Sequence, residues 1–499
     1  MKTVECWGIY ELSLTADTSG MGNPFAQSFR AIVEGPGAAH RVDGFYSGGD
    51  VFKIRYMPCE EGVHKVSVKS DISSLNDMTD EFTVLPPSKG NHGPAVVRGT
   101  RFGYADGSRL FIAGTTAYVW HHRPAEVRDQ SLKSFTKYGF NKIRMLFFPK
   151  HYTGGYGAID ISYEPPCYPF EGKPGAFDFY KPNPTYFDEF EDRLRELKTR
   201  DIFADVILFH PYDFGHWSID SGMDEDGALF YVKYLIARIA CFSNVWWSLA
   251  NEYDIKMLDK EHMVVGWDVR DWDVIGEFIK ARDPSGHPIS CHNIPFGRIY
   301  PNRPWLSHVS YQHPDTYTLM GELLSTYQKP VINDEYQYEG NTQDDWGNTS
   351  GETELERHWR SVMAGGYATH GEAFIRSNNR DIFWAYGGDM IGKSPLRIAF
   401  LRKIVGKVPL DEMTRDYVNS DAQHYYSLRR GYDRYLIFMR DDLPGKKLWI
   451  GDWEKPRDGL RYVAATYDVW NCKKVKEEVV TAKDGIPITK WTAVILKKL

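Results

Sequence analysis

The chain has 499 residues, of which 42% are hydrophobic and 25% are charged, a composition typical of a globular protein with several domains. Its formal net charge of −7 leaves no excess of basic residues to neutralise phosphates, which argues against a nucleic-acid-binding protein. No apolar run approaches the roughly 18 consecutive residues of a membrane span, so no membrane partner is expected. The first residues show no charged stretch followed by a continuous apolar one, which predicts a cytoplasmic protein.

The two ends of the chain have the pattern of β domains. Over residues 1–88, short runs of alternating apolar and polar residues are separated by Gly, Pro and Asp clusters, which predicts an antiparallel β-sandwich. The segment Pro86–Pro94 (PPSKGNHGP) has the composition of a linker. Short alternating runs such as Tyr435–Met439 return after residue 410, and they predict a small antiparallel β domain over residues 415–499.

The central part, residues 95–408, alternates strand-like runs with segments of helical period. In Pro184–Lys198, the clearest helical segment, the apolar residues fall on one face and Pro184 suits the first turn. The strand-like runs are Leu110–Val119, Asn141–Phe148, Ile202–Phe209, Val245–Ala250, Pro288–His292, Val309–Gln312, Val331–Asn333 and Gly371–Ile375. Eight strands with alternating helices predict an α/β fold, a (β/α)8 TIM barrel, whose sites lie at the C-terminal ends of the strands.

Two of these predicted strands end in acidic residues. VWWSLA runs into Asn251 and Glu252, and PVIN runs into Asp334 and Glu335. Two carboxylates at strand ends suit glycoside cleavage, in which one protonates the leaving oxygen and the other attacks or stabilises the anomeric carbon. Because neighbouring residues of a strand point to opposite faces, Asp334 is expected to face the helices if Glu335 faces the barrel axis.

Other polar residues lie near these strand ends. Arg144, in the run KIRML, could keep one acid ionised or could form an ordinary structural ion pair, and the sequence leaves both interpretations open. His210 and His216 are six residues apart, which matches no compact metal-ligand spacing, so they and His313 favour sugar binding. No metal or cofactor is predicted. Glu372, on the last predicted strand, is expected in the pocket.

The Ala250-Asn251-Glu252 motif at the end of strand four, with Glu335 at the end of strand seven, resembles clan A glycoside hydrolases, particularly family 5. The order of parts is similar to that of bacterial family-5-like and apiosidase-like glycosidases. The resemblance implies that Glu252 is the acid/base and Glu335 the nucleophile of a two-glutamate double displacement that retains anomeric configuration. It also implies that Asn251 orients a sugar hydroxyl, that Arg144 steadies the nucleophile and that His210 is a site histidine.

Two strands depart from the pattern of that family. Strand six usually carries a His followed two residues later by a Tyr, whereas this chain has Tyr311-Gln312-His313, in the reverse order. Either residue could therefore approach Glu335. Strand eight commonly carries a tryptophan, and here Trp384 follows only later. We expect Tyr311, His313 and Trp384 to contact the substrate.

The sequence thus predicts a retaining glycosidase acting on plant- or microbe-derived oligosaccharides. The long segments Lys150–Asn183, His210–Met223 and Ser377–Lys393 could wall the barrel mouth into a pocket, which favours an exo-acting β-glycosidase. An endo-acting glucanase or mannanase-type hydrolase is one alternative, because long loops also build the sides of clefts. A non-catalytic carbohydrate-binding barrel is another, although a binding module has no need for two converging carboxylates. The oligomeric state stays open.

Overall fold

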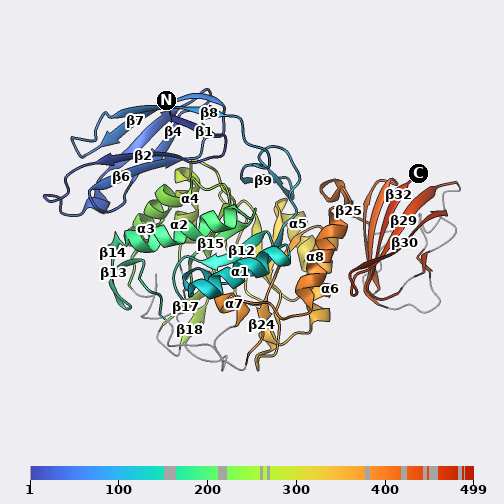
Figure 1. Ribbon diagram of the computed structural model, residues 1–499. Coiled ribbons are helices and arrows are strands. Elements are labelled where there is room, and N and C mark those ends of the chain that lie inside the picture. The colour runs from blue at the N-terminus through green and yellow to red at the C-terminus, as the bar shows by residue number, and fades with distance from the viewer. Residues whose placement is uncertain are drawn as a thin grey trace.

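The structure is a computed structural model with three parts: an N-terminal β-sandwich, a central barrel and a C-terminal β sheet (Figure 1). It describes residues 2–150, 164–211, 222–258, 262–266, 270–376, 382–416, 424–441, 447–448, 459–481, 486–487 and 489–499. Among these residues, no helix has both the length and the apolar character needed to cross a membrane.

The N-terminal part consists of two β sheets packed around one apolar core. A five-stranded sheet in the order β1-β8-β7-β3-β4 faces a three-stranded sheet in the order β2-β6-β5. One pair departs from the expected antiparallel pattern, since β1 runs parallel to β8. The strands are β1 (Lys2–Glu5), β2 (Tyr10–Thr15), β3 (Phe29–Glu34), β4 (His40–Asp43), β5 (Phe45–Tyr46), β6 (Val51–Tyr56), β7 (Gly62–Ser70) and β8 (Thr79–Leu85).

The central part is a nearly closed barrel of eight parallel strands, which confirms the predicted fold class. Its strand order is β19-β16-β15-β12-β11-β23-β21-β20, and every pair of neighbours is parallel. The two end strands approach each other where the backbone N–H of Ser307 donates to the carbonyl of Ile289 at 2.9 Å. The strands are β11 (Ala113–Thr116), β12 (Lys142–Leu146), β15 (Phe203–Phe209), β16 (Val245–Ala250), β19 (Ile289–Ser290), β20 (Val309–Gln312), β21 (Val331–Glu335) and β23 (Tyr367–His370).

Helices cover the outside of the barrel. Helix α2 begins where the sequence predicts, because the side chain of Asn183 accepts a hydrogen bond from the N–H of Thr185 and Pro184 occupies the first turn. The connection from β19 to β20, described over residues 291–308, contains no helix. The helices are α1 (Ala125–Lys137), α2 (Pro184–Lys198), α3 (Glu225–Ile239), α4 (Trp272–Arg282), α5 (Thr318–Tyr327), α6 (Gly351–Ala364), the short α7 (Phe383–Tyr386) and α8 (Ser394–Val405).

The eighth barrel strand lies four residues before its predicted start. The sequence predicts Gly371–Ile375, but the strand is β23 (Tyr367–His370). The backbone leaves the barrel at Gly371, which packs so closely on the ring of Tyr338 that a Cβ atom would lie 1.7 Å from it. The following residues form β24 (Glu372–Ala373), which pairs with β22 (Glu339–Gly340) outside the barrel sheet. Glu372 is therefore not on a barrel strand, contrary to the prediction.

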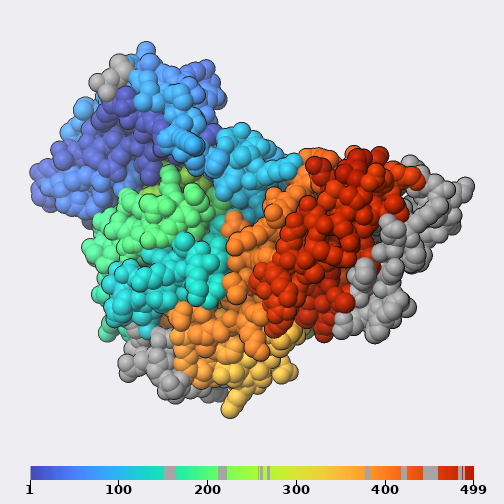
Figure 2. Space-filling model, turned by 45° about the vertical axis from the view of Figure 1, so that its right-hand side comes forward, coloured from blue at the N-terminus to red at the C-terminus, as the bar shows by residue number. Residues whose placement is uncertain are grey.

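The C-terminal part is a six-stranded antiparallel sheet in the order β25-β26-β27-β32-β29-β30. It lies against the part of the barrel that contains α6 and α8 (Figures 1 and 2). There the rings of Trp359 and Phe438 stack with centroids 4.7 Å apart. The strands are β25 (Thr414–Arg415), β26 (Tyr425–Arg430), β27 (Arg434–Met439), β29 (Arg461–Asp468), β30 (Lys473–Thr481) and β32 (Thr492–Lys498), beside the short pair β28 (Lys447–Leu448) and β31 (Ile486–Pro487).

Candidate active site

The two predicted catalytic acids lie at the C-terminal ends of barrel strands. Glu335 is the last residue of β21 and its side chain is buried. Asn251 and Glu252 follow β16 directly, and Glu252 has a backbone φ of +55°, a left-handed conformation that is uncommon for residues other than glycine. The chain therefore turns sharply at Glu252, whose side chain stays partly open to solvent.

Arg144 joins the two strand ends. Its Nη1 atom lies 2.6 Å from Oε1 of Glu335, and its Nη2 atom donates to the side-chain oxygen of Asn251. The hydroxyl of Tyr118, which follows β11, donates to the same Glu335 oxygen. The Nε2 atom of His292, which follows β19, lies 3.5 Å from it. The Glu335 carboxylate thus meets side chains from three different strands or strand ends of the barrel.

These contacts separate the pKa values of the two acids. Burial alone would raise the pKa of Glu335, but the hydrogen bond from His292 and the positive charge of Arg144 outweigh it and lower the pKa to about 2. The pKa of Glu252 is raised to about 8, first by desolvation and then by the negative charges of Glu335 and Asp254. At neutral pH, Glu335 is ionised and Glu252 is protonated.

The expectation that Asp334 faces the helices is wrong. Its carboxylate lies inside the barrel, where it accepts hydrogen bonds from Lys142 Nζ, Ser310 Oγ and Thr369 Oγ1, each at 2.6 Å. The cause is a register shift between β20 and β21, which pairs Tyr311 with Asn333 but Gln312 with Glu335. This bulge leaves Asp334 unpaired, so the alternation of faces is broken and both acids meet side chains of β12.

Lys142 is the cation that compensates Asp334, and its removal is expected to destabilise the barrel. The Lys142 ammonium is fully buried and also lies 2.8 Å from Asp205. Lys142→Met would leave two buried carboxylates without their cation, so we expect a loss of about 3–5 kcal/mol in the free energy of unfolding. Urea denaturation followed by tryptophan fluorescence measures this. The matched control is Lys181→Met, which breaks an exposed pair with Asp178 and should cost less than about 1 kcal/mol. Equal losses in the two variants would contradict the assignment.

The other predicted site residues lie in different environments. The hydroxyl of Tyr311 donates to the backbone oxygen of Asp315, 3.2 Å away, and its ring belongs to the main apolar core. The backbone N–H of His313 donates to the backbone carbonyl of Glu335 at 3.0 Å. Of the two candidates from strand six, His313 is therefore bonded to Glu335 through the backbone.

Trp384 returns to the pocket from the short helix α7. Its ring stacks on Tyr338 at 5.8 Å and meets Tyr118 edge-on at 5.6 Å. Burial and then the negative charge of Glu335 raise the pKa of Tyr338, which lies beside that carboxylate. Trp384 thus packs on both tyrosines that lie beside Glu335.

Three predicted residues remain. His210 is buried at the end of β15, with its ring centroid 6.4 Å from that of Phe148. The carboxylate of Glu372 accepts hydrogen bonds from the N–H groups of Ile391 and Gly392, so it holds the segment after α7 in place. His216 lies outside the described residues. Among the described residues, no group of three or more His, Cys, Asp or Glu side chains could hold a metal ion.

The sequence interpretation missed Tyr118, His292 and Tyr338. Tyr118 and His292 fall at the C-terminal ends of the predicted strands Leu110–Val119 and Pro288–His292, where a barrel places its functional residues. Their position at the predicted strand ends is the sequence feature that could have identified them as site residues. Tyr338 follows β21 in the run YQYE, and nothing in its spacing separates it from the other tyrosines.

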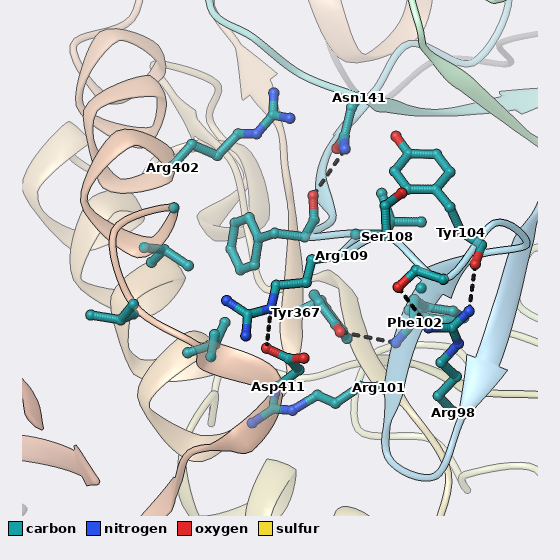
Figure 3. A pocket seen from close by; sticks show the side chains of 18 residues that line it. Arg98, Arg101, Phe102, Tyr104, Ser108, Arg109, Asn141, Tyr367, Arg402 and Asp411 are labelled. Carbon is teal, nitrogen blue, oxygen red and sulfur yellow. Dashed lines mark hydrogen bonds and ion pairs between the residues drawn. The ribbon is translucent and has the colours of Figure 1, made fainter. Parts of the chain in front are cut away.

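A hollow of about 530 Å³ lies at the end of the barrel opposite to Glu335 (Figure 3). It is lined by the hairpin of β9 (Ala95–Arg98) and β10 (Arg101–Tyr104), by the residues that precede β11 and β12, and by the segment after α8. Two of its arginines pair within the lining: Arg109 lies 3.0 Å from Asp411, and Arg98 donates to the carbonyl of Tyr104 at 2.7 Å. Asp411 is the one carboxylate among its described lining residues, so we place the active site at the other end.

Comparisons with known proteins identify the family of the chain. The family model described as "Apiosidase-like, catalytic domain" matches residues 98–382, and residues 3–71 match a domain of unknown function, DUF5060. A comparison with curated proteins gives no match.

Solved structures extend the match beyond the barrel. A "putative glycoside hydrolase" from Bacteroides vulgatus ATCC 8482 is 32% identical over 100% of both chains, with a TM-score of 0.87. A glycoside hydrolase family 5 protein from the same organism is 17% identical, with 82% of this chain and 94% of that chain covered and a TM-score of 0.56, which shows a shared fold. With more than half of its length matched by one family model, this chain belongs to the apiosidase-like family of glycoside hydrolases.

Proposed function

We propose that this protein is a retaining β-glycosidase in which Glu335 is the nucleophile and Glu252 the acid/base. The observation that carries the proposal is the asymmetry between the two carboxyl groups. Arg144, Tyr118 and His292 all stabilise the charged form of Glu335. Among the described residues, Glu252 has no comparable cluster of donors, and its pKa is raised to about 8. Double displacement requires one ionised and one protonated carboxyl group at the same pH.

In the first step, the Glu335 carboxylate attacks the anomeric carbon while the bond from that carbon to the leaving oxygen breaks. Glu252 gives its proton to the leaving oxygen, and a covalent glycosyl-enzyme remains. In the second step, Glu252 takes a proton from water, whose oxygen attacks the anomeric carbon and releases Glu335. Because Arg144 donates to the Asn251 oxygen, the orientation of the Asn251 amide is fixed, and its NH2 group is the side that donates to a sugar hydroxyl.

For the substrate we propose plant- or microbe-derived oligosaccharides cleaved from one end. The support for exo-action is the length of the segments Lys150–Asn183, His210–Met223 and Ser377–Lys393, of which residues 151–163, 212–221 and 377–381 lie outside the described part. The last segment supplies Trp384, which packs on Tyr338 beside Glu335. An oligosaccharide labelled at its reducing end should lose one terminal unit at a time; early mid-chain fragments would contradict exo-action.

The anomeric configuration of the first product tests the mechanism. We expect hydrolysis of a member of an aryl β-glycoside panel, with the same configuration in the first-formed sugar as in the substrate. Proton NMR during the first minutes, before mutarotation, distinguishes the anomers. A product of inverted configuration would contradict Glu335 as a nucleophile and would indicate direct attack by water. Complete inactivity across pyranoside and furanoside panels would contradict the glycosidase function itself.

A further inference from the structure

Phe296 is an aromatic side chain held out at the barrel mouth. It lies in the helix-free connection between β19 and β20, and 69% of its surface is exposed. Its backbone φ is +59°, a left-handed conformation that is strained for a bulky residue. Strain of this kind costs of order 1–3 kcal/mol and persists only where the surrounding structure imposes it. An exposed and strained phenylalanine near a catalytic centre calls for a functional explanation.

The turn that carries Phe296 is fixed from the segment of the acid/base. Asp254, two residues after Glu252, is buried and accepts a hydrogen bond from the N–H of Ile294 at 2.7 Å. The N–H of Gly297 donates to the carbonyl of Ile294 at 2.7 Å, which closes the turn around Phe296. A Cβ atom on Gly297 would lie 2.3 Å from Asp254, so the turn packs directly on that carboxylate. The ring is therefore presented by a rigid support.

His313 supplies a polar partner beside this ring. The ring centroids of Phe296 and His313 are 5.0 Å apart with an interplanar angle of 80°. The Nδ1 atom of His313 accepts a hydrogen bond from the N–H of Asp315 at 2.9 Å, so the neutral ring carries its proton on Nε2. No described residue accepts from that Nε2–H group, which can donate to a ligand hydroxyl. The His313 backbone is in turn bonded to Glu335.

Trp346 connects Phe296 to the aromatic residues around Glu335. Its ring lies 6.5 Å from that of Phe296, again nearly perpendicular. Its backbone carbonyl accepts a hydrogen bond from the N–H of Tyr338 at 2.7 Å, and its side chain packs on the cluster that contains Tyr118 and Trp384. A chain of aromatic contacts thus connects the residues around Glu335 with Phe296.

We propose that Phe296, His313 and Trp346 form a second sugar subsite, which binds a unit of the substrate next to the one at the carboxyl pair. A sugar ring has an apolar C–H face and a rim of hydroxyl groups. An open aromatic face with a hydrogen-bond donor at right angles matches both features. The inference rests on the proposed glycosidase function and adds that the preferred substrate has at least two sugar units.

Binding to an inactive variant tests the subsite. In a Glu335→Gln background, calorimetry measures affinity for xylo-, manno-, cello- and galacto-oligosaccharides of one to four units. We expect Phe296→Ala to weaken binding of a disaccharide or longer by about tenfold and to leave monosaccharide binding unchanged. Phe296→Tyr, which keeps the ring, should bind normally, and so should the control Leu396→Ala, an exposed residue on α8.

The outcomes separate the two proposals. Unchanged oligosaccharide binding in Phe296→Ala, equal weakening for all chain lengths, or no binding of any probe to the Glu335→Gln protein would overturn the subsite. In a different outcome, Phe296→Ala weakens the binding of longer oligosaccharides in the Glu335→Gln background, but the unmodified protein hydrolyses none of them. That result would overturn the glycosidase function and support the subsite.

Discussion

Glu335→Gln is expected to lower kcat on aryl glycosides by about 10⁴-fold or more, because no glycosyl-enzyme forms without the carboxylate nucleophile. The amide keeps the shape of the buried side chain and still accepts from Tyr118 and Arg144, so the fold should persist. Circular dichroism and the thermal midpoint provide the control for folding. Activity within about tenfold of the unmodified protein would contradict the assignment.

Glu252→Ala should show a different pattern, because the acid/base acts on the leaving group. The rate of cleavage should fall strongly for an unactivated glycoside. It should fall little for the first step with a dinitrophenyl glycoside, because that leaving group needs no proton. Azide can enter the space left by the side chain and attack the glycosyl-enzyme, so it should restore turnover and give a glycosyl azide of retained configuration. Azide should not rescue Glu335→Gln in this way. Identical behaviour of the two variants would contradict their separate roles.

The regular parts of the barrel can be predicted from the sequence because buried parallel strands appear in it as continuous apolar runs. Strand β16 has its predicted bounds, since VWWSLA is an apolar run that ends at Asn251 and Glu252. Strand β23 has a weaker apolar pattern, because it is only four residues long, it follows two glycines, and it contains Thr369 and His370. The more apolar run beginning at Gly371 is the one that leaves the barrel, so hydropathy alone selected the wrong segment.

The candidate site also contains residues whose positions the sequence predicts and others whose positions it does not. The positions of Glu252 and Glu335 follow from strand ends, which a single sequence reveals. The inward orientation of Asp334 depends on a bulge in the pairing of β21 with β20, and such a register is a property of two strands together. Tyr118 and His292 come from strands that are distant from Glu335 in the chain, so only closure of the barrel brings them together. The sequence reveals local order, and the remaining contacts depend on how the strands assemble.

Arg144→Met is expected to move the acidic limb of the pH profile to higher pH. The Arg144 charge favours the ionised form of Glu335, so its removal raises the Glu335 pKa above about 2, and the nucleophile becomes protonated at a higher pH. The alkaline limb follows deprotonation of Glu252 near pH 8. Arg144 lowers the pKa of Glu252 as well, so this limb should not move to lower pH. At neutral pH we expect kcat/KM to fall by ~10²-fold, since a fixed electrostatic group beside the reacting centre is lost.

The profile of kcat/KM against pH also decides between the two roles that the sequence left open for Arg144. A purely structural ion pair predicts a lower thermal midpoint with both limbs unchanged. A positioning role predicts a shifted acidic limb in the fraction of protein that stays folded. Arg144→Lys is the matched variant: it keeps the positive charge near Glu335 but loses the planar fork that also holds Asn251. We therefore expect Arg144→Lys to keep the acidic limb close to its original position while kcat/KM still falls, because the Asn251 amide is no longer oriented toward the substrate.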